Sequence, residues 1–372
     1  MKTIKTKINF KNQTNMKKPN QWLIAGIALI SVMQGCKKDD PKLVAATAGG
    51  AYDSGVFVAC EGPFGSGTGT VSFYNRTTGA VSNDIFQSAN TFPLGNVVQS
   101  VNIYNGKGYV VVNNAGKIEV VTANDFKSVG SITGLNSPRY FLGITSAKGY
   151  VSEWGTTGGT VRVINLSNNS ISSTINVGNG AENMVMVNNN VYVACSGGFV
   201  NDSIVTVINS TTDAVVTTIN VGPNPGDIKV DANGKIWVLC GGQWNGSFTS
   251  LDKTGKLVRI NPSNNTVEQT FTFSSTLSMP SNLAINSAKN KLFYTYQGKI
   301  YNHDITALNL SSMGLVDRSF YGLGFDPVND YLYAADAGNF SSNGKVVRYN
   351  GSTGSKVDSF AVGIIPGDFF FR

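Results

Sequence analysis

The stretch VYVACSGG at residues 191–198 recurs along the chain and decides the fold. Six further stretches share its apolar alternation: VFVACEGP at 56–63, GYVVVNNA at 108–115, GYVSEWGT at 149–156, IWVLCGGQ at 236–243, LFYTYQGK at 292–299 and LYAADAGN at 332–339. Successive copies begin 40 to 56 residues apart. A period of about 40–45 residues, lengthened by insertions, is typical of the four-stranded blades of a β-propeller.

Each copy stands second in a group of four predicted strands. An apolar strand such as GDIKVD at 226–231 and a tight turn come before it, and strands such as GTVRVIN at 159–165 and VVTTINVG at 215–222 come after it. Asn-Gly in these turns suits hairpins that need positive φ. The apolar alternation gives the strands two buried faces, as stacked blades require. Residues 55–372 are therefore predicted to form one all-β, seven-bladed β-propeller.

The two ends of the repeat region are incomplete in complementary ways. The first copy has no good strand before it, and the chain stops after PGDFFFR at 366–372, a first strand with no second strand to follow. We predict that Phe369–Phe371 pair with Val56–Ala59 and close the ring, because an open ring would leave two unpaired sheet edges. This pairing also predicts that Asp368 reaches the rim of the channel, aligned with Asp227.

The basic net charge of +7 does not indicate nucleic-acid binding. Six of the 29 basic residues lie in residues 1–35, which contain no acidic residue, so the remaining 23 are balanced by 22 acidic ones. No basic stripe with interleaved aromatic residues remains, and such a stripe is the usual footprint of a nucleic-acid site.

The basic N-terminal segment resembles a bacterial lipoprotein signal. MKKPNQWLIAGIALISVMQGC at 16–36 combines a cationic start, a short apolar run and a small residue before Cys36, although Met33 stands where such signals usually carry Leu. We expect a signal peptide over 1–35, acylation of Cys36 and a flexible tether over 36–54; an ordinary secretory signal is the alternative, and Met16 is an alternative start. Lys37–Asp40 resembles the signal that sends lipoproteins of Bacteroidota to the outer face of the outer membrane.

The repeat itself resembles the YVTN-repeat propellers, also called YncE-like, whose blades read VYVAN, then VSVID, then VG..P. Cys60, Cys195 and Cys240 stand where that family usually has Asn. The resemblance implies the seven-bladed fold. Among surface lipoproteins of Bacteroidota it also implies an accessory receptor that captures a nutrient, cobalamin being the best-known case, for a TonB-dependent transporter.

Few residues suggest catalysis or metal binding. His303 is the single histidine, so a Ser-His-Asp triad would depend on it, and a structural role is the expectation. Cys60, Cys195 and Cys240 share one register, and equivalent positions on stacked sheets lie about 10 Å apart, too far for a disulfide. We expect free, buried thiols, with a Cys195–Cys240 redox or metal pair as the alternative, and we predict no cofactor and no metal site.

The unusual residues gather on one predicted face of the propeller. The loops after the second strands and the connections between blades open there, and the longest loop, GGQWNGSFTSLDKTG at 241–255, is among them. Aromatic side chains among amides and a few charges are typical of a ligand site; the alternative is that the Asp and Asn residues bond backbone and the aromatic residues fill gaps between blades. The candidate ligand-binding residues are Glu61, Phe64, Arg139, Tyr140, Glu153, Trp154, Glu182, Asn183, Phe199, Asp227, Trp244, Phe248, Asn282, Tyr296, Tyr321, Asp336, Phe340 and Asp368.

Three classes of function follow from this pattern. The first is a non-enzymatic, monomeric lipoprotein at the cell surface, anchored to the outer membrane, whose partners are a small-molecule ligand and an outer-membrane transporter. The second is a propeller enzyme of the lactonase, lyase or quinoprotein type, in which Glu153, Glu182, Asp227 and Asp336 would line a metal-binding channel mouth. The third is a scaffold or adhesin, since fold does not fix function.

Overall fold

A computed structural model gives the structure of the chain and describes residues 50–156 and 158–372. The predicted signal peptide, the acylation site at Cys36 and the tether up to residue 49 lie outside the described residues. Among the described residues, no helix is both long enough and apolar enough to cross a membrane.

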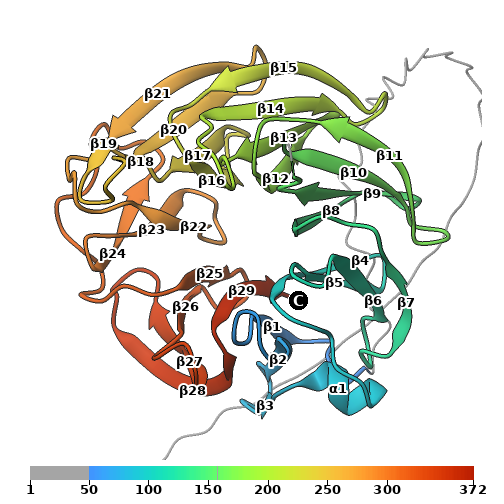
Figure 1. Ribbon diagram of the computed structural model, residues 1–372. Helices are drawn as coiled ribbons and strands as arrows, with labels where there is room; N and C mark the ends of the chain where they lie inside the picture. Colours follow the sequence, from blue (N-terminus) through green and yellow to red (C-terminus); the bar gives the residue numbers. More distant parts are fainter. Residues whose placement is uncertain (1–49, 157) are drawn as a thin grey trace, which may run out of the picture. The chain divides into compact units, whose positions relative to one another are not determined.

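Seven β-sheets follow one another around a common axis and form the seven predicted blades (Figure 1). We number the blades in the order of the sequence copies. The inner strands of blades 1 to 7 are β29 (Pro366–Phe371), β4 (Val98–Tyr104), β8 (Pro138–Thr145), β12 (Ala181–Val187), β16 (Pro225–Val230), β22 (Ser281–Ile285) and β25 (Gly322–Asp326). The second strands, which carry the repeated motif, are β1 (Gly55–Cys60), β5 (Lys107–Val112), β9 (Lys148–Glu153), β13 (Asn190–Cys195), β17 (Ile236–Cys240), β23 (Lys291–Tyr296) and β26 (Tyr331–Asp336).

The third and outer strands complete the blades. The third strands are β2 (Thr70–Asn75), β6 (Lys117–Thr122), β10 (Thr160–Asn165), β14 (Ile204–Asn209), β20 (Lys256–Asn261), β24 (Lys299–Asp304) and β27 (Asn343–Asn350). The outer strands are β3 (Val81–Ser82), β7 (Ser128–Ile132), β11 (Ser170–Asn176), β15 (Ala214–Asn220), β21 (Thr266–Thr272) and β28 (Lys356–Ile364). Blade 6 has no outer strand among the described residues, and neighbouring strands in every blade pair antiparallel.

Blade 1 is built from both ends of the described chain, as predicted (Figure 1). β29 pairs with β1, with Phe371 opposite Val56. Phe369 and Phe371 pack against Tyr333 of blade 7, with ring centroids 6.0 and 5.3 Å apart, whereas Phe370 packs on the core between blades 1 and 2. The three terminal phenylalanines therefore fill both faces of one inner strand and close the ring.

The last residue ties this closure to the segment that leads into the propeller. The Arg372 backbone N–H donates to the Gly55 carbonyl at 3.0 Å, and its guanidinium donates to the carbonyls of Tyr52 and Ala123. The guanidinium also forms an ion pair with Asp53 at 2.8 Å. Tyr52 and Asp53, at the end of the predicted tether, therefore already contact the propeller.

The core lies between successive blades and is built on one repeated position. The second residue of every copy of the repeated motif is aromatic and at most 1% exposed: Phe57, Tyr109, Tyr150, Tyr192, Trp237, Phe293 and Tyr333. Burial of a side chain of this size contributes about 1.5–3 kcal/mol. The repeated aromatic position thus supplies each pair of blades with one large apolar contact.

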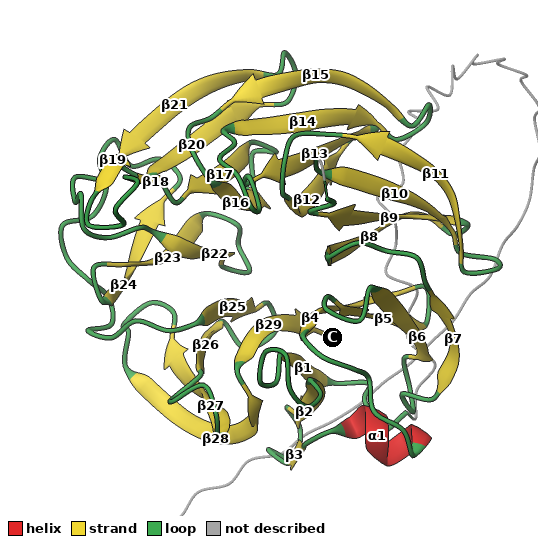
Figure 2. Ribbon diagram, viewed as in Figure 1, coloured by secondary structure: helices red, strands yellow, loops and turns green. Residues whose placement is uncertain are grey.

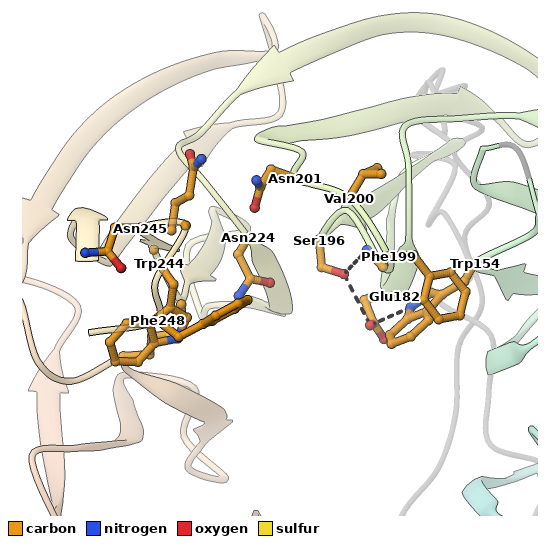
Figure 3. Close-up of a pocket in the computed structure, with 15 residues that line it drawn as sticks. Trp154, Glu182, Ser196, Phe199, Val200, Asn201, Asn224, Trp244, Asn245 and Phe248 are labelled. Carbon is orange, nitrogen blue, oxygen red and sulfur yellow. Dashed lines mark hydrogen bonds between the residues drawn. The ribbon is translucent and has the colours of Figure 1, made fainter. Parts of the chain in front are cut away.

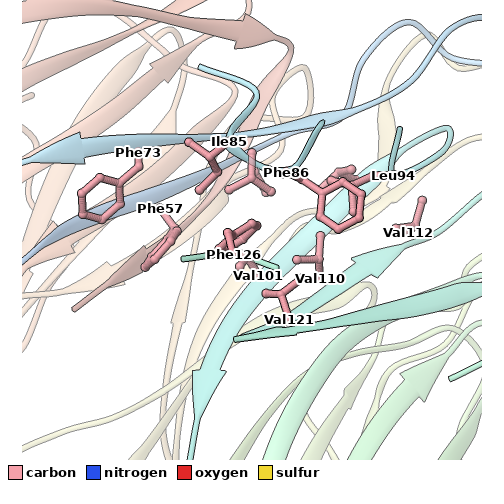
Figure 4. Packing of buried hydrophobic residues seen from close by; sticks show 13 residues of the cluster. Phe57, Phe73, Ile85, Phe86, Leu94, Val101, Val110, Val112, Val121 and Phe126 are labelled. Atoms are coloured by element: carbon pink, nitrogen blue, oxygen red, sulfur yellow. The ribbon is translucent and has the colours of Figure 1, made fainter. Parts of the chain in front are cut away.

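The sequence pattern does not predict α1 (Ile85–Asn90), the one helix among the described residues (Figure 2). The Asp84 side chain accepts a hydrogen bond from the Gln87 backbone N–H at its start. Ile85 and Phe86 are buried in the core between blades 1 and 2 (Figure 4). α1 follows the very short outer strand β3 and covers the core beside it.

The predicted hairpin chemistry is confirmed at the turns between inner and second strands. Asn105 and Gly106, which join β4 to β5, have φ values of 50° and 75°. Asn188 before β13 and Gly234 before β17 are also left-handed, at 56° and 71°. Asn105 and Gly106 match the two-residue turn that follows the right-handed twist of a hairpin, whereas Gly234 lies in the longer connection of residues 231–235 between β16 and β17.

Candidate ligand-binding site

Five of the predicted ligand-binding residues line one pocket of about 500 Å³ on the predicted face, among the loops of blades 3, 4 and 5. They are Trp154, Glu182, Phe199, Trp244 and Phe248. Figure 3 shows Trp154 and Phe199 on one side of the pocket and Trp244 and Phe248 on the other. Two aromatic walls of two residues each therefore face each other across the pocket.

The first aromatic wall is held in place by polar contacts. The Trp154 indole Nε1–H donates to Glu182 at 2.8 Å, and the Arg139 guanidinium lies 4.5 Å from the centre of the Trp154 ring. Phe199 meets Trp154 edge to face, with ring centroids 5.2 Å apart. A Cβ atom at Gly198 would lie 3.2 Å from the indole, so only a residue without a side chain leaves this space free. The indole is thus fixed before a ligand arrives.

The second aromatic wall comes from the longest loop, which forms a small hairpin of β18 (Gln243–Trp244) and β19 (Leu251–Lys253). The Asn245 side chain accepts a hydrogen bond from the Thr249 N–H and donates to Thr249 and Ser250, which closes the turn. Phe248 at this turn has φ of 56° and is 77% exposed. A bulky residue rarely adopts this conformation unless its surroundings enforce it, and such strain is frequent in ligand-binding loops.

Three uncharged amides also line the pocket. Asn201, Asn224 and Gln243 line the pocket, and their side chains have no hydrogen-bond partner among the described residues. Sequence reasoning missed all three, because amides are common in the turns of this chain and carry no separate signal. Free amides offer both donors and acceptors to a ligand.

Glu182 is the one charged residue of the pocket lining. Arg139 pairs with it at 2.9 Å and also donates to Gln99, and the Ser196 hydroxyl lies 3.3 Å from the Glu182 carboxylate. Because Arg139 compensates the charge of Glu182, the pocket presents no unpaired charge. Its chemistry suits an uncharged ligand with apolar faces and hydrogen-bonding edges.

A second group of predicted residues lies at blades 7 and 1. The Tyr321 hydroxyl donates to Glu61 at 3.0 Å, and the Tyr321 ring meets Phe340 edge to face at 5.6 Å. Burial raises the pKa of Glu61. Phe64 in the same blade 1 loop is 81% exposed. None of these residues lines the pocket of blades 3 to 5.

The predicted Asp and Asn residues at the starts of the inner strands join neighbouring blades. Asp368 accepts a hydrogen bond from the Val101 N–H at 3.3 Å, and Asp227 accepts one from the Leu283 N–H at 3.1 Å. The predicted alignment of Asp368 with Asp227 is thus confirmed by their equivalent contacts, each with the inner strand of the next blade.

Two asparagines extend this ring of contacts. The Asn183 amide donates to Asp227 at 3.1 Å, and the Asn282 amide donates to the Phe320 carbonyl at 3.0 Å. Asp368 and Asn183 also line a smaller cavity of about 190 Å³ on the axis, with Tyr140 and Lys229. Burial raises the pKa of Asp368 to about 7.

Three further predicted residues are committed to local contacts. Glu153 is 0% exposed and accepts hydrogen bonds from Thr160, Arg162 and a backbone N–H, so it does not reach the pocket. Asp336 pairs with Arg318 and Lys345. Tyr296 is buried between blades 5 and 6.

The histidine and the cysteines lie inside the fold. His303 on β24 is buried against Trp237 and Phe271, and burial lowers its pKa to about 4. Cys60, Cys195 and Cys240 are free and buried, as expected. Burial raises the thiol pKa of all three, to about 12 for Cys60 and about 11 for Cys195. Within residues 50–156 and 158–372, no three His, Cys, Asp or Glu side chains gather in a way that could hold a metal.

Solved structures of propeller type resemble the chain at low sequence identity. A functionally unknown protein from Desulfotomaculum acetoxidans shares 12% identity at a TM-score of 0.63, covering 86% of this chain and 98% of the other. A quinonprotein alcohol dehydrogenase-like protein from Bacteroides thetaiotaomicron shares 16% identity at 0.62, covering 86% and 78%. AztD from Citrobacter koseri shares 13% at 0.52, covering 84% and 82%. These likenesses show the fold alone.

Sequence comparison points to a family. The family model described as "Domain of unknown function (DUF5074)" matches residues 54–371, which is the whole propeller. No curated protein matches the chain.

Proposed function

The chain belongs to the DUF5074 family, and we propose that this member is a non-enzymatic binding protein that captures a ligand in the pocket of blades 3 to 5. One observation carries the proposal. Trp154, Phe199, Trp244 and Phe248 come from three separate loops, yet they converge on one pocket. Phe199 and Phe248 are each 77% exposed, and apolar side chains that gather at one place on the surface mark an interaction site.

The pocket favours an uncharged ligand with flat apolar faces and a rim of hydrogen-bonding groups. The aromatic walls supply apolar contact, the free amides of Asn201, Asn224 and Gln243 supply donors and acceptors, and the single carboxylate is already paired with Arg139. A corrinoid, a large ring with amides around its edge, has this chemistry. Cobalamin, which the YncE-like resemblance implies, is therefore the ligand that we propose to test first.

We further propose that the protein is a lipoprotein of the outer membrane, exposed at the cell surface, that passes its ligand to a TonB-dependent transporter. Support comes from the sequence of residues 16–40, with Cys36 after the apolar run. Acylation of Cys36 in cells would be checked by labelling with a palmitate analogue, which Cys36→Ser should abolish. Protease digestion of the chain on intact cells would report its exposure, and an unlabelled wild-type chain would contradict the lipoprotein assignment.

Isothermal titration of the purified full-length chain with cyanocobalamin tests ligand capture. We expect binding, and we expect Phe248→Ala to weaken it about tenfold, equivalent to about 1.4 kcal/mol, because the aromatic residue supplies one wall of the pocket. Mass spectrometry of the chain purified from its native membrane would show independently which compound it carries.

Phe340→Ala is the matched control for this experiment. Phe340 is also an exposed loop phenylalanine with positive φ, 51% exposed and at 61°, but it does not line the pocket. Equal weakening by both variants would place the ligand outside the pocket. Absence of heat with cyanocobalamin, together with no co-purifying compound, would overturn the proposal of ligand capture.

A further inference from the structure

Blade 6 holds a further cavity that is separate from the proposed ligand pocket and from the small cavity on the axis. The cavity has a volume of about 350 Å³ and shares no lining residue with the pocket of blades 3 to 5. Its lining comes from the end of β21, from β23 and β24, and from the chain that follows β24: Thr272, Phe273, Ser274, Tyr294, Tyr296, Gln297, Tyr301, Leu310, Ser311 and Ser312.

The cavity exists because blade 6 departs from the repeat. The chain after β24 runs irregularly from residue 305 to 321 where other blades have an outer strand. In this part of the described chain, its one bridge to the sheet joins Ile300 and Val316. Leu310–Ser312 then cover the side of β23 and β24 without filling the space above the tyrosines.

The lining of the cavity is polar but uncharged. None of its residues is Asp, Glu, Lys, Arg or His. The hydroxyls of Tyr294 and Tyr301 and the amide of Gln297 have no hydrogen-bond partner among the described residues, and burial raises the pKa of Tyr294. The Tyr296 hydroxyl, in contrast, is fixed by accepting a hydrogen bond from the Ser275 N–H at 2.7 Å.

We propose that this cavity binds a neutral cyclic polyol, such as a single saccharide unit. Hydroxyls and an amide each donate and accept, which matches the hydroxyls of a sugar ring. The side chains of Phe273, Leu310 and the tyrosines match the apolar C–H faces of the same ring.

The absence of charge defines what the cavity excludes. A carboxylate or phosphate would be buried here with no cation to compensate it, which is costly. A purely apolar ligand would desolvate the free hydroxyls of Tyr294 and Tyr301 without bonding them. The cavity volume lies within the range of about 300–1,000 Å³ that is usual for small-molecule sites.

The test is saturation-transfer NMR, followed by isothermal titration, on the purified full-length chain. The probes are the methyl glycosides of glucose, galactose and mannose, with methyl glucuronide as the charged counterpart of the first. We expect millimolar binding of at least one neutral glycoside and no binding of the glucuronide. Tyr301→Phe and Gln297→Ala should each weaken the neutral glycoside about fivefold, because each removes one hydrogen bond.

Tyr321→Phe is the control, because Tyr321 is an exposed tyrosine outside the cavity. Circular dichroism of each variant verifies that it is folded. The proposal is overturned if none of the three neutral glycosides binds, if the glucuronide binds as tightly, or if Tyr301→Phe and Tyr321→Phe behave alike. Because this cavity shares no lining residue with the pocket of blades 3 to 5, the result of this test is independent of whether that pocket binds a ligand.

Discussion

The sequence places the residues at the starts of the inner strands and those of the pocket of blades 3 to 5 on the same predicted face of the propeller. The structure gives the two groups different roles. Asp227 and Asp368 accept hydrogen bonds from the next blade and are committed to the ring. Phe199 and Phe248 are each 77% exposed and contribute little to the core. Residues of the first kind hold the propeller together, whereas those of the second kind are available to a ligand.

This difference has a physical cause. An inner strand lies beside the inner strands of two neighbouring blades, so a short side chain at its start finds a backbone N–H within reach. A loop after a second strand has no neighbour above it, and its side chains remain free unless another loop approaches. Variants in the two regions should therefore separate stability from binding.

Deletion of residues 364–372 should have the largest effect. It removes β29, and with it the pairing to β1 and the packing of Phe369–Phe371 on both faces. Because β1 becomes an open edge, we expect the protein to lose its cooperative thermal transition and to aggregate. Circular dichroism would measure the transition, and light scattering would measure the aggregation. An unchanged melting temperature would contradict a closed ring.

Asp368→Asn should change how stability depends on pH. The Asp368 pKa is raised to about 7 in the folded protein from an ordinary value near 3.8, so the folded state holds the proton more tightly. The contribution of Asp368 to wild-type stability should therefore fall as pH rises from about 4 to about 7, by at most about 1.4 kcal/mol per pH unit.

Asparagine removes this titration, and urea unfolding at several pH values would measure the difference between the two proteins. His303 acts in the opposite sense. Because its pKa is lowered to about 4 in the folded protein, its contribution to stability increases as pH rises from about 4 towards 6.5. The comparison with Asp368→Asn isolates the contribution of the aspartate. Identical slopes in the two proteins would contradict the raised pKa.

Asp227→Ala should destabilise the fold by about 1–3 kcal/mol, because the Leu283 N–H and the Asn183 amide lose their acceptor. Its effect would be read from the urea midpoint. Asp317→Ala is the control, since the Asp317 side chain is 85% exposed and its pair with Lys299 is worth little. A comparable loss of stability in both variants would show that the hydrogen bonds of Asp227 do not stabilise the contact between blades.

Phe248→Ala should have the smallest effect on stability, within about 0.5 kcal/mol, since the side chain is mostly exposed. Its expected consequence is on ligand binding alone. A stability loss as large as that of Asp227→Ala would show that the hairpin of β18 and β19 supports the fold. The pocket and the starts of the inner strands would then not differ in their contribution to stability.

Prediction from sequence was accurate where the repeat is regular. The seven second strands, the pairing of β29 with β1 and the buried free cysteines follow from spacing and alternation. The site was predicted less sharply. The sequence places eighteen residues on one face, but the spatial convergence of Trp154, Phe199, Trp244 and Phe248 depends on how three loops fold over the blades.

The repeat pattern also did not predict the places where a blade departs from the repeat. α1 and the missing outer strand of blade 6 lie in segments with no counterpart in other blades, so no second copy constrains their interpretation. Glu153 illustrates the same limit for a single residue. It ends a second strand beside Trp154, yet Arg162 and Thr160 hold it inside the blade.

The sequence by itself determined the number of blades, their strand order and the way the ring closes, because period and alternation are local properties that every copy repeats. Only the tertiary structure decided which polar residues bridge blades, which aromatic residues form a pocket and where a cavity opens in blade 6. Those outcomes depend on contacts between loops and strands that are distant in sequence, and nothing in the repeat specifies such contacts.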